Sequence, residues 1–411
     1  MCKGTSQFKS RDLRRFGKKP NLDVMILHKL GEFAFNWLKA HSLAGFRETE
    51  FLCFSINKFM ECPNQTAPNM FILSGFPYPE DLRFPLLLLF SIMFILTLSA
   101  NALILGMVIS DLQLHKPMYW FLGHLSILDM IFTTVVVPKV IAGFTPGGKV
   151  ISFGGCVSQL FIFHFIGCSE CFLYSMMAYD RFLAICKPLH YTNIMNWKTC
   201  LFLSLGTVIG GCLNSSFLTS LTFHLPFGED NHIDYVFCDI PAVLKLACID
   251  IQFNQLMIIT DMGFFTMACF LLILASYAYI IIAILKISSS EGRQRAFSTC
   301  SAHLMVVLIY YLPIFYHYMR QGSQNSMDIV VSMSYTTITP FLNPVIYTLR
   351  NKDIKTALVK LWGMDIVDQI AQTLKMLFKN IEESSFIQMT VNVSNDGAGD
   401  LFRRVKKWNH K

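Results

Sequence analysis

Four charged side chains lie inside long apolar stretches of this sequence, where their chemistry is unusual. They are Asp129, Glu170, Arg181 and Asp261. An ionised side chain in hydrocarbon is costly, so a charged residue in such a stretch marks a functional site by default. Carboxylates suit a hard cation or a cationic ligand. For Glu170, simple packing as a hydrogen-bonded polar group stays open as an alternative.

Glu170 and Arg181 are 11 positions apart in one apolar stretch. At about 100° and 1.5 Å per residue, they share one helix face within ~20° and are separated by ~16 Å along the axis. The same stripe also carries Phe163, Gly167, Tyr174 and Met177. We therefore expect this face to point into a helix bundle.

The composition places these residues in a membrane protein. The chain of 411 residues is 53% hydrophobic and only 15% charged, which is too few charges to cover a water-soluble globule of this size. The net charge of +7 fits a cationic cytoplasmic face better than a nucleic-acid partner. The thirteen Cys form neither a short-spaced disulfide framework nor a zinc motif.

Long apolar runs predict an all-α membrane protein, a seven-transmembrane helix bundle. Lipid offers the backbone no hydrogen bonds, so each spanning segment needs about 20 residues of helix. The predicted spans are Phe84–Ile109, Pro117–Ala142, Cys156–Phe182, Thr199–Leu221, Gln255–Leu285, Ser298–Met319 and Ile329–Leu349.

The charges between the spans predict the orientation. Basic residues gather at one set of span ends, for example Lys187, Lys286 and Arg293, and acidic residues gather at the other, for example Glu229 and Asp250. The positive-inside rule then puts the N-terminus outside and the C-terminus inside. A glycosylation sequon at Asn64, just before the first span, gives weak independent support.

The predicted domain organisation follows from these spans. Residues 1–59 form an atypical N-terminal extension that we expect to be disordered, and residues 60–83 an extracellular segment. Residues 84–349 form the seven-helix domain. Residues 350–363 form a short cytoplasmic helix, and residues 364–411 an atypical cytoplasmic tail. Apolar residues in this tail recur at helical spacing, and a surface helix and chance are both open explanations.

Several long motifs in order carry a family resemblance. They are Met177–Cys186 (MAYDRFLAIC) with Pro188–Tyr191, Leu114–Tyr119 (LHKPMY), Leu125–Asp129, Ser276–Tyr277, Arg295–Leu304 (RAFSTCSAHL) and Pro340–Tyr347 (PFLNPVIY). The sequence resembles the olfactory (odorant) receptor family of rhodopsin-like class A G-protein-coupled receptors over about residues 60–363. It departs from the family pattern at Ala100, Phe182-Leu183, Leu312 and Gly228.

The resemblance implies roles for the buried polar residues. Asp180 and Arg181 would form a polar lock at the cytoplasmic mouth, and Tyr277 and Tyr347 would pack around the released arginine during G-protein coupling. A second group, Asp129, Glu170 and Asn343, would form a polar cluster able to hold an allosteric sodium ion. Without a cation, one of these carboxylates should be protonated. No other metal or cofactor is implied.

The resemblance also implies a disulfide between Cys156 and Cys238, which suits an oxidising exterior. Family members commonly have a further Cys where this chain has Gly228, and its partner would be Cys248. We therefore expect Cys248 to be a free thiol.

The ligand site implied by the resemblance lies in the outer half of the bundle. Its candidate residues are Phe163, His164, Gly167, Asp261 and Tyr311. His164 lies ~100° from the inward stripe, so helix packing is an equal alternative for it. Asp261 could bind an amine. It lies 16 residues from Tyr277, ~160° of rotation, so the two should not share a face.

The resemblance thus predicts a plasma-membrane odorant receptor of sensory cilia, without catalysis. Its partners would be a small, mostly apolar volatile ligand, the heterotrimeric stimulatory olfactory G protein that raises cAMP, and membrane lipid, but no nucleic acid. One alternative is a misfolding or decaying receptor-like product. Another is a seven-helix transporter, which would need inverted repeats or broken helices that the sequence does not show.

Overall fold

A computed structural model of the chain describes residues 68–362, except residues 77, 229, 250 and 320–325. The chain divides into two compact units, Met1–Gln65 and Thr66–Lys411, and every described residue belongs to the second. The expectations for residues 1–59, the Asn64 sequon and the 364–411 tail therefore lie outside the described residues.

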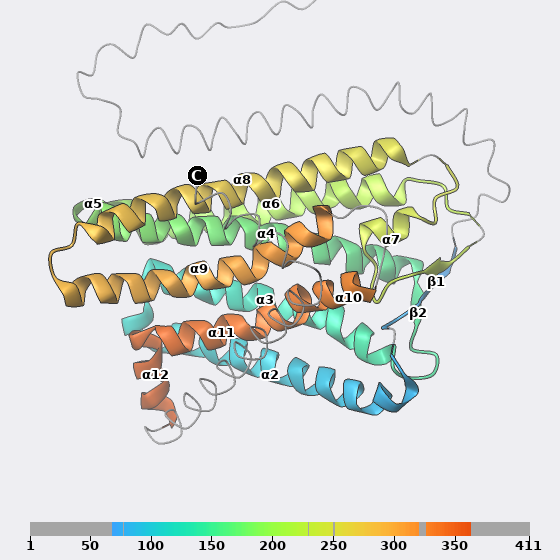
Figure 1. Ribbon diagram of the computed structural model, residues 1–411, viewed down its shortest axis with the longest axis horizontal. Coiled ribbons are helices and arrows are strands. Elements are labelled where there is room, and N and C mark those ends of the chain that lie inside the picture. The colour runs from blue at the N-terminus through green and yellow to red at the C-terminus, as the bar shows by residue number, and fades with distance from the viewer. Residues whose placement is uncertain (1–67, 77, 229, 250, 320–325, 363–411) are drawn as a thin grey trace, which may run out of the picture. The chain divides into compact units, whose positions relative to one another are not determined.

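Long helices that run side by side make up most of the described chain (Figure 1). They are α2 (Arg83–Ser110), α3 (Pro117–Ala142), α4 (Phe153–Cys186), α6 (Trp197–Phe223), α8 (Gln252–Leu285) and α9 (Ser290–Met319). The last span consists of α10 (Ser326–Met333), the π-helix η4 (Ser334–Ile338) and α11 (Thr339–Arg350).

The composition of these helices fits a membrane. Six described helical stretches are long and apolar enough to cross a bilayer, and a shorter apolar stretch, His303–Tyr316, lies within α9. Large apolar side chains such as Leu88, Ile95 and Leu271 remain exposed on the outside of the bundle, as expected for a surface that faces lipid. The seven-helix fold predicted from the sequence is confirmed.

Capping and proline residues define where several helices begin. The side chain of Ser152 accepts a hydrogen bond from Gly155 N at the start of α4, and Asn196 accepts one from Thr199 N at the start of α6. Pro117 occupies the first position of α3, where its missing N–H costs nothing. The two capped helices each begin two or three residues before the predicted spans, and α3 has the predicted bounds.

The seventh span, predicted only as one apolar stretch, is not α-helical throughout. The N–H of Thr339 bonds to the carbonyl of Ser334, five residues back, which is the π pattern. Pro340 follows directly, and since it has no N–H it cannot continue the α-helical ladder. The π-helical turn therefore interrupts the regular α-helix directly before α11.

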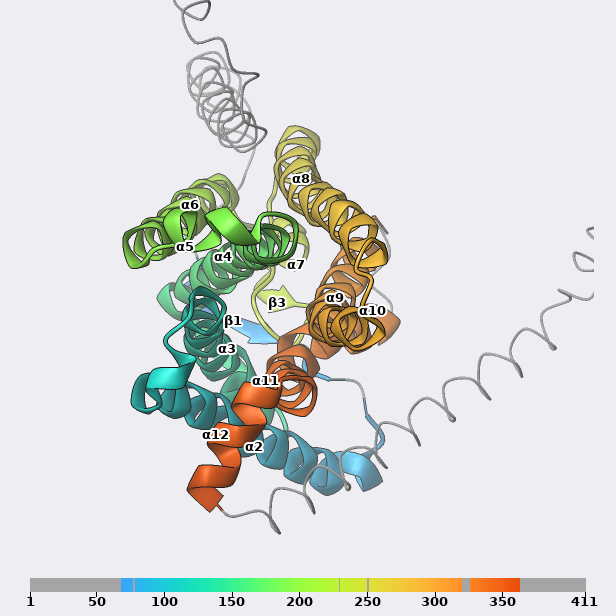
Figure 2. The same ribbon diagram turned by 90° about the vertical axis from the view of Figure 1, so that its left-hand side faces the viewer.

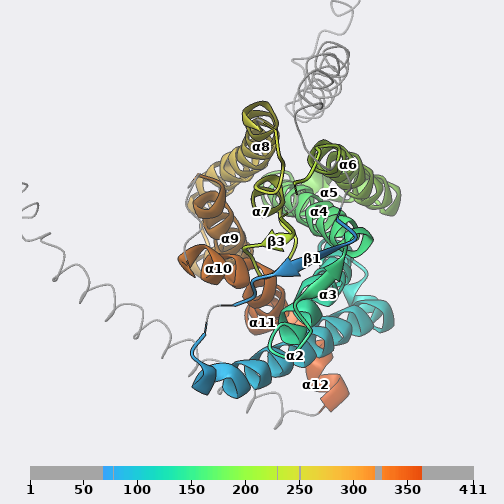
Figure 3. The same ribbon diagram turned by 90° about the vertical axis from the view of Figure 1, so that its right-hand side faces the viewer.

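The two ends of the bundle carry different short elements. One end, called the sheet end here, carries the strands β1 (Met70–Leu73), β2 (Val150–Ser152) and β3 (His232–Ile233), and the short helix α7 (Ile240–Leu244) (Figure 3). Strand β1 is central, antiparallel to β2 and parallel to β3. The opposite end, called the α12 end, carries η3 (Leu112–Leu114), α5 (Pro188–Ile194) and α12 (Lys352–Trp362) (Figure 2). A short 3-10 helix, η2 (Glu80–Leu82), precedes α2.

Helix α4 is the centre of the bundle. It contacts α3, α6, α8 and α9, and its inward positions are buried along its whole length. Both Glu170 and Tyr174 are at most 2% exposed, so the stripe inferred from their spacing does point into the bundle. Residues on this one helix can therefore take part in sites at both ends.

Candidate functional site

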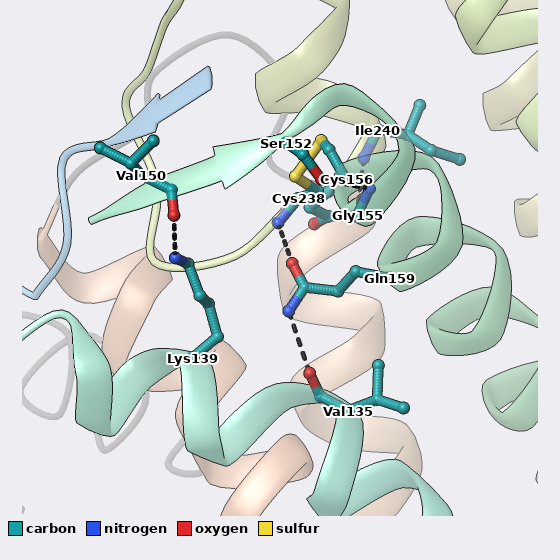
Figure 4. Close-up of a disulfide and its surroundings, with 10 residues drawn as sticks. Val135, Lys139, Val150, Ser152, Gly155, Cys156, Gln159, Cys238 and Ile240 are labelled. Atoms are coloured by element: carbon teal, nitrogen blue, oxygen red, sulfur yellow. Dashed lines mark hydrogen bonds between the residues drawn. A yellow bond between two sulfur atoms is a disulfide. The ribbon is translucent and has the colours of Figure 1, made fainter. Parts of the chain in front are cut away.

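A disulfide fixes a loop over the sheet end of the bundle. Cys156, in the first turn of α4, is bonded to Cys238, and both are fully buried (Figure 4). One turn further along α4, Gln159 accepts a hydrogen bond from Cys238 N (2.9 Å) and donates one to Val135 O (3.0 Å). The loop is thus attached to α4 by the disulfide and by the hydrogen bond to the side chain of Gln159.

A small cavity lies beneath this loop. The space in it that is free for water-sized molecules is about 50 Å³, enough for a few waters but below the roughly 300–1,000 Å³ of drug-sized ligand pockets. Its walls come from α3, α4, α6, α8, α9 and η4. They are formed by Phe132, Phe163, His164, Gly167, Cys168, Cys171, Asn214, Met262, Phe265, Thr266, Tyr310, Ile314 and Tyr335.

Three of the five predicted ligand residues, Phe163, His164 and Gly167, line this cavity. His164 Nε2 lies 3.5 Å from Asp239 Oδ1, and both side chains are at most 3% exposed. Asp239 also accepts a hydrogen bond from Ile240 N at the start of α7. The imidazole therefore lies against the disulfide-bonded loop, while its Nε2 makes no hydrogen bond among the described residues.

The other two predicted ligand residues, Tyr311 and Asp261, are not among the described residues that line the cavity. Tyr311 is buried, and its hydroxyl donates to Cys171 O at 3.4 Å. Asp261 Oδ2 accepts a hydrogen bond from Asn214 Nδ2 at 2.6 Å, so its carboxylate faces α6. Tyr277 on the same helix faces α9, which agrees with the rotation of ~160° between these positions.

The predicted ion cluster lies deeper, between α3, α4 and α11. Asn343 Nδ2 donates to both oxygens of Asp129, at 3.0 and 3.2 Å, and also lies 3.2 Å from the hydroxyl of Tyr174. Glu170 is 2% exposed, and its Oε1 has no hydrogen-bond partner among the described residues. An unpaired oxygen and a second buried carboxylate are the kind of donors that a hard cation uses.

The predicted lock lies at the α12 end. The guanidinium of Arg181 bonds to Asp180 Oδ2 through Nη2 (2.8 Å) and Nε (3.2 Å). The hydroxyl of Tyr191 on α5 donates to the other oxygen, Oδ1, at 2.7 Å. Burial, and next the Asp180 carboxylate, raise the pKa of Tyr191, so this hydroxyl stays protonated and keeps donating. Asp180 is fully buried, and both of its oxygens are bonded.

The predicted tyrosines are close to this lock, together with one residue that the motif analysis did not single out. The Tyr277 hydroxyl lies 2.7 Å from His303 Nδ1 and donates to Cys300 O at 3.2 Å. Tyr347 is 4% exposed, and its hydroxyl has no hydrogen-bond partner in the described part of the chain. His303 belongs to the Arg295–Leu304 motif, so its polar character within an apolar helix was the signal available in the sequence.

One expectation is wrong. Cys248, predicted to be a free thiol, is disulfide-bonded. The prediction assumed that Cys248 could pair only at position 228. Gly228 does lie next to it, since a Cβ built there would be 3.8 Å from Cys248 Cβ.

Comparison with known proteins decides the family. The family profile described as "Olfactory receptor" matches residues 90–364. Human olfactory receptor 10G6 is 54% identical over 307 residues, which cover 75% of this chain and 92% of that protein. This chain belongs to the olfactory receptor family. Human olfactory receptor 10G7 (48% identical, 72% and 96% covered) and mouse olfactory receptor 10D1B (46% identical, 72% and 95% covered) agree.

Membership gives the receptor its class. Olfactory receptors are seven-helix signalling receptors of class A and not enzymes, and the apolar helices make this chain a multi-pass membrane protein. The family binds small odorants and couples to G proteins. Among the described residues, no cluster of three or more His, Cys, Asp or Glu side chains could hold a metal ion.

Proposed function

We propose that this receptor binds a small, mostly apolar volatile ligand in the cavity beneath the sheet-end loop and activates a stimulatory olfactory G protein, which raises cAMP. The observation that carries the proposal is the position of this cavity. It is lined by residues of α3, α4, α6, α8, α9 and η4, has aromatic walls at Phe132, Phe163 and Phe265, and offers a few polar groups. Concave apolar sites with few polar anchors are typical of small-molecule pockets.

The proposed orientation puts the sheet end outside and the α12 end in the cytoplasm. The disulfide between Cys156 and Cys238 at the sheet end favours this, since disulfides persist on the oxidising side of a membrane. Lys116, Lys187 and Lys360 at the α12 end agree with the positive-inside rule. The expected location is the plasma membrane of olfactory sensory cilia.

In this proposal the α12 end is the switch. Arg181 is held by Asp180 and Tyr191 in the conformation described above. Ligand binding at α4 and α9 releases the guanidinium toward the G protein, because α4 carries both the cavity wall and the lock. Tyr277 and Tyr347 would then pack against the released side chain.

A sodium ion is proposed as an allosteric ligand of the cluster formed by Asp129, Glu170 and Asn343. The chemistry of these residues suits a hard cation, because both carboxylates are buried and one oxygen of Glu170 has no hydrogen-bond partner among the described residues. The ion would supply positive charge between the two acids and stabilise the inactive arrangement.

The test of coupling is Arg181→Ala in the full-length receptor, read with a cAMP reporter and surface staining. We expect loss of cAMP output with surface staining largely retained. Lys198→Ala, an exposed basic residue at the same end of the bundle, is the matched control and should signal normally. Normal cAMP output from Arg181→Ala would rule out the coupling role.

A further inference from the structure

Asn214 is a buried polar group of the cavity wall. It lies in α6, is 4% exposed and lines the cavity. Its Nδ2 donates to Asp261 Oδ2 at 2.6 Å. Among the described residues, its carbonyl oxygen Oδ1 accepts no hydrogen bond. Since a primary amide has both donors and acceptors, Asn214 offers the cavity an acceptor.

Asp261 determines which way this amide points. A carboxylate accepts hydrogen bonds, so the nitrogen of Asn214 must face it and the oxygen must face away. Turning the amide over would place two oxygens against each other. Asp261 does not belong to the cavity wall and acts through Asn214, which makes it a positioning residue.

Thr266 provides a second polar group in the same cavity. It lies on α8, is 7% exposed and lines the wall. Other helical threonines here, such as Thr134 and Thr260, donate to the carbonyl four residues back. The hydroxyl of Thr266 makes no such bond within the described part of the chain, so it is available to a ligand.

These two groups favour a particular ligand chemistry. A hydroxyl group both donates and accepts, so it can donate to Asn214 Oδ1 and accept from Thr266 Oγ1. An ether or a hydrocarbon would leave the buried amide oxygen unpaired, which costs binding free energy. An ammonium ion could donate, but no acidic side chain is among the described wall residues, and a buried charge needs a partner.

We infer that the receptor selects neutral molecules that carry a hydroxyl group, with Asn214 as the specificity residue and Asp261 holding it in place. This inference rests on the proposed ligand cavity and names its ligand class. It differs from the amine binding that the sequence left open for Asp261, because the wall presents the amide rather than the carboxylate.

The experiment uses matched compounds on the full-length receptor with a cAMP reporter. The probes are benzyl alcohol, benzyl methyl ether and benzylamine, then cyclohexanol, methoxycyclohexane and cyclohexylamine, then octanol, methyl octyl ether and octylamine. We expect an alcohol to act at a half-maximal concentration about tenfold lower than its ether or amine, the effect of one hydrogen bond.

The variants test whether Asp261 acts by positioning Asn214 or through its own charge. Asn214→Leu should raise the half-maximal concentration of the alcohol about tenfold and leave that of the ether unchanged. Asp261→Asn keeps an amide oxygen that accepts from Asn214, so its half-maximal concentration for the alcohol should stay within about threefold of the wild-type value. Asp261→Leu should raise the half-maximal concentration of the alcohol as much as Asn214→Leu does. Ser216→Ala, an exposed residue of α6 bonded within its own helix, is the matched control. Thr266→Val tests the same selectivity if Asn214→Leu fails to reach the surface.

The outcomes that overturn the inference are distinct. Equal responses to alcohol and ether, or an amine response that Asp261→Asn abolishes, would contradict it while leaving an odorant receptor. Silence toward every alcohol from a receptor that does answer other odorants would contradict it too. Silence toward all odorants from a receptor at the cell surface would instead overturn the proposed function.

Discussion

At the scale of single residues, the two buried acids Asp129 and Glu170 differ in their hydrogen bonding. Asp129 is 1% exposed and is hydrogen-bonded to Asn343, whereas one oxygen of Glu170 has no hydrogen-bond partner among the described residues. Two acids so close in a low-dielectric interior repel each other unless a cation or a proton intervenes. The proposed sodium ion would remove this repulsion.

Removing one acid therefore tests the ion. In Asp129→Asn, we expect that sodium in place of choline no longer shifts the half-maximal odorant concentration, because one of two carboxylate ligands is lost. In wild type the shift should be present, and in Ser216→Ala, the control, it should be unchanged. A sodium effect that persists in Asp129→Asn at full size would exclude this cluster as the site.

Position 228 gives a second residue-scale prediction. A Cβ at Gly228 would lie 3.8 Å from Cys248 Cβ, within the range of natural disulfides. Gly228→Cys should therefore compete for Cys248 and restore the pairing that is common in the family. Mass mapping of non-reduced peptides should find a 228–248 crosslink. Finding Cys248 only in its present disulfide would show that the competing bond does not form.

Residue roles were partly predictable from the sequence. Charged residues in apolar stretches pointed to Asp129, Glu170 and Arg181, and helix geometry separated Asp261 from Tyr277. Asn214 was not among the predicted ligand residues, because nothing in a linear sequence shows that α6 brings it against Asp261. The disulfide of Cys248 was missed for a similar reason, since spacing along the chain does not show which cysteines meet.

At the scale of elements, α12 is attached to the loop between α2 and α3 by two ion pairs. Lys116 Nζ lies 2.7 Å from Asp353, and Lys360 Nζ lies 3.1 Å from Asp111. The hydrogen bond from Lys116 lowers the pKa of Asp353. Backbone bonding from Gln113, followed by Lys360, lowers the pKa of Asp111. Both carboxyl groups therefore stay ionised at pH values somewhat below 3.8, the ordinary pKa of an aspartate.

The sign of these shifts gives a pH prediction. A carboxyl group with a lowered pKa in the folded state stabilises the docked helix above its unfolded pKa, and this contribution is lost as the pH falls through the lowered value. We expect α12 to stay docked from pH 8 down to about pH 4 and to loosen only below that. A spin label on Thr356→Cys, with Cys212→Ser to remove an exposed thiol, would report its mobility.

Variants that remove the two ion pairs test the docking of α12 at neutral pH. Lys116→Gln combined with Lys360→Gln should loosen α12 at pH 7, and Lys198→Gln on the distant α6 should not. Loosening of the wild type already between about pH 6 and 7, the range of histidine, would contradict control by the ion pairs.

The elements themselves were predictable to different degrees. Unbroken apolar runs located the long helices closely, with α3 matching to the residue. Helix α9 begins at Ser290, eight positions before its predicted span at Ser298, because its first turns are polar and extend beyond the apolar part. The π-helix η4 was not predicted, since apolarity does not show which backbone bonds a proline interrupts.

At the scale of the whole molecule, the family match covers only part of the chain. The relatives named above align over about three quarters of it, and the family profile begins at residue 90. Removing residues 1–59 should therefore leave surface expression and odorant response unchanged. Surface staining and cAMP dose response of the truncated receptor test this. A truncated receptor that stays inside the cell would show that the extension is needed.

Coupling of the intact receptor to its G protein decides most directly whether this chain is a signalling odorant receptor. The full-length chain would be expressed with a cAMP reporter in two matched cell lines, one with and one without the stimulatory olfactory G-protein α subunit, and exposed to a broad odorant panel. We expect at least one odorant to raise cAMP in a dose-dependent way only where the α subunit is present. A receptor that reaches the surface of both lines and answers no odorant, or answers equally without the α subunit, would contradict the claim.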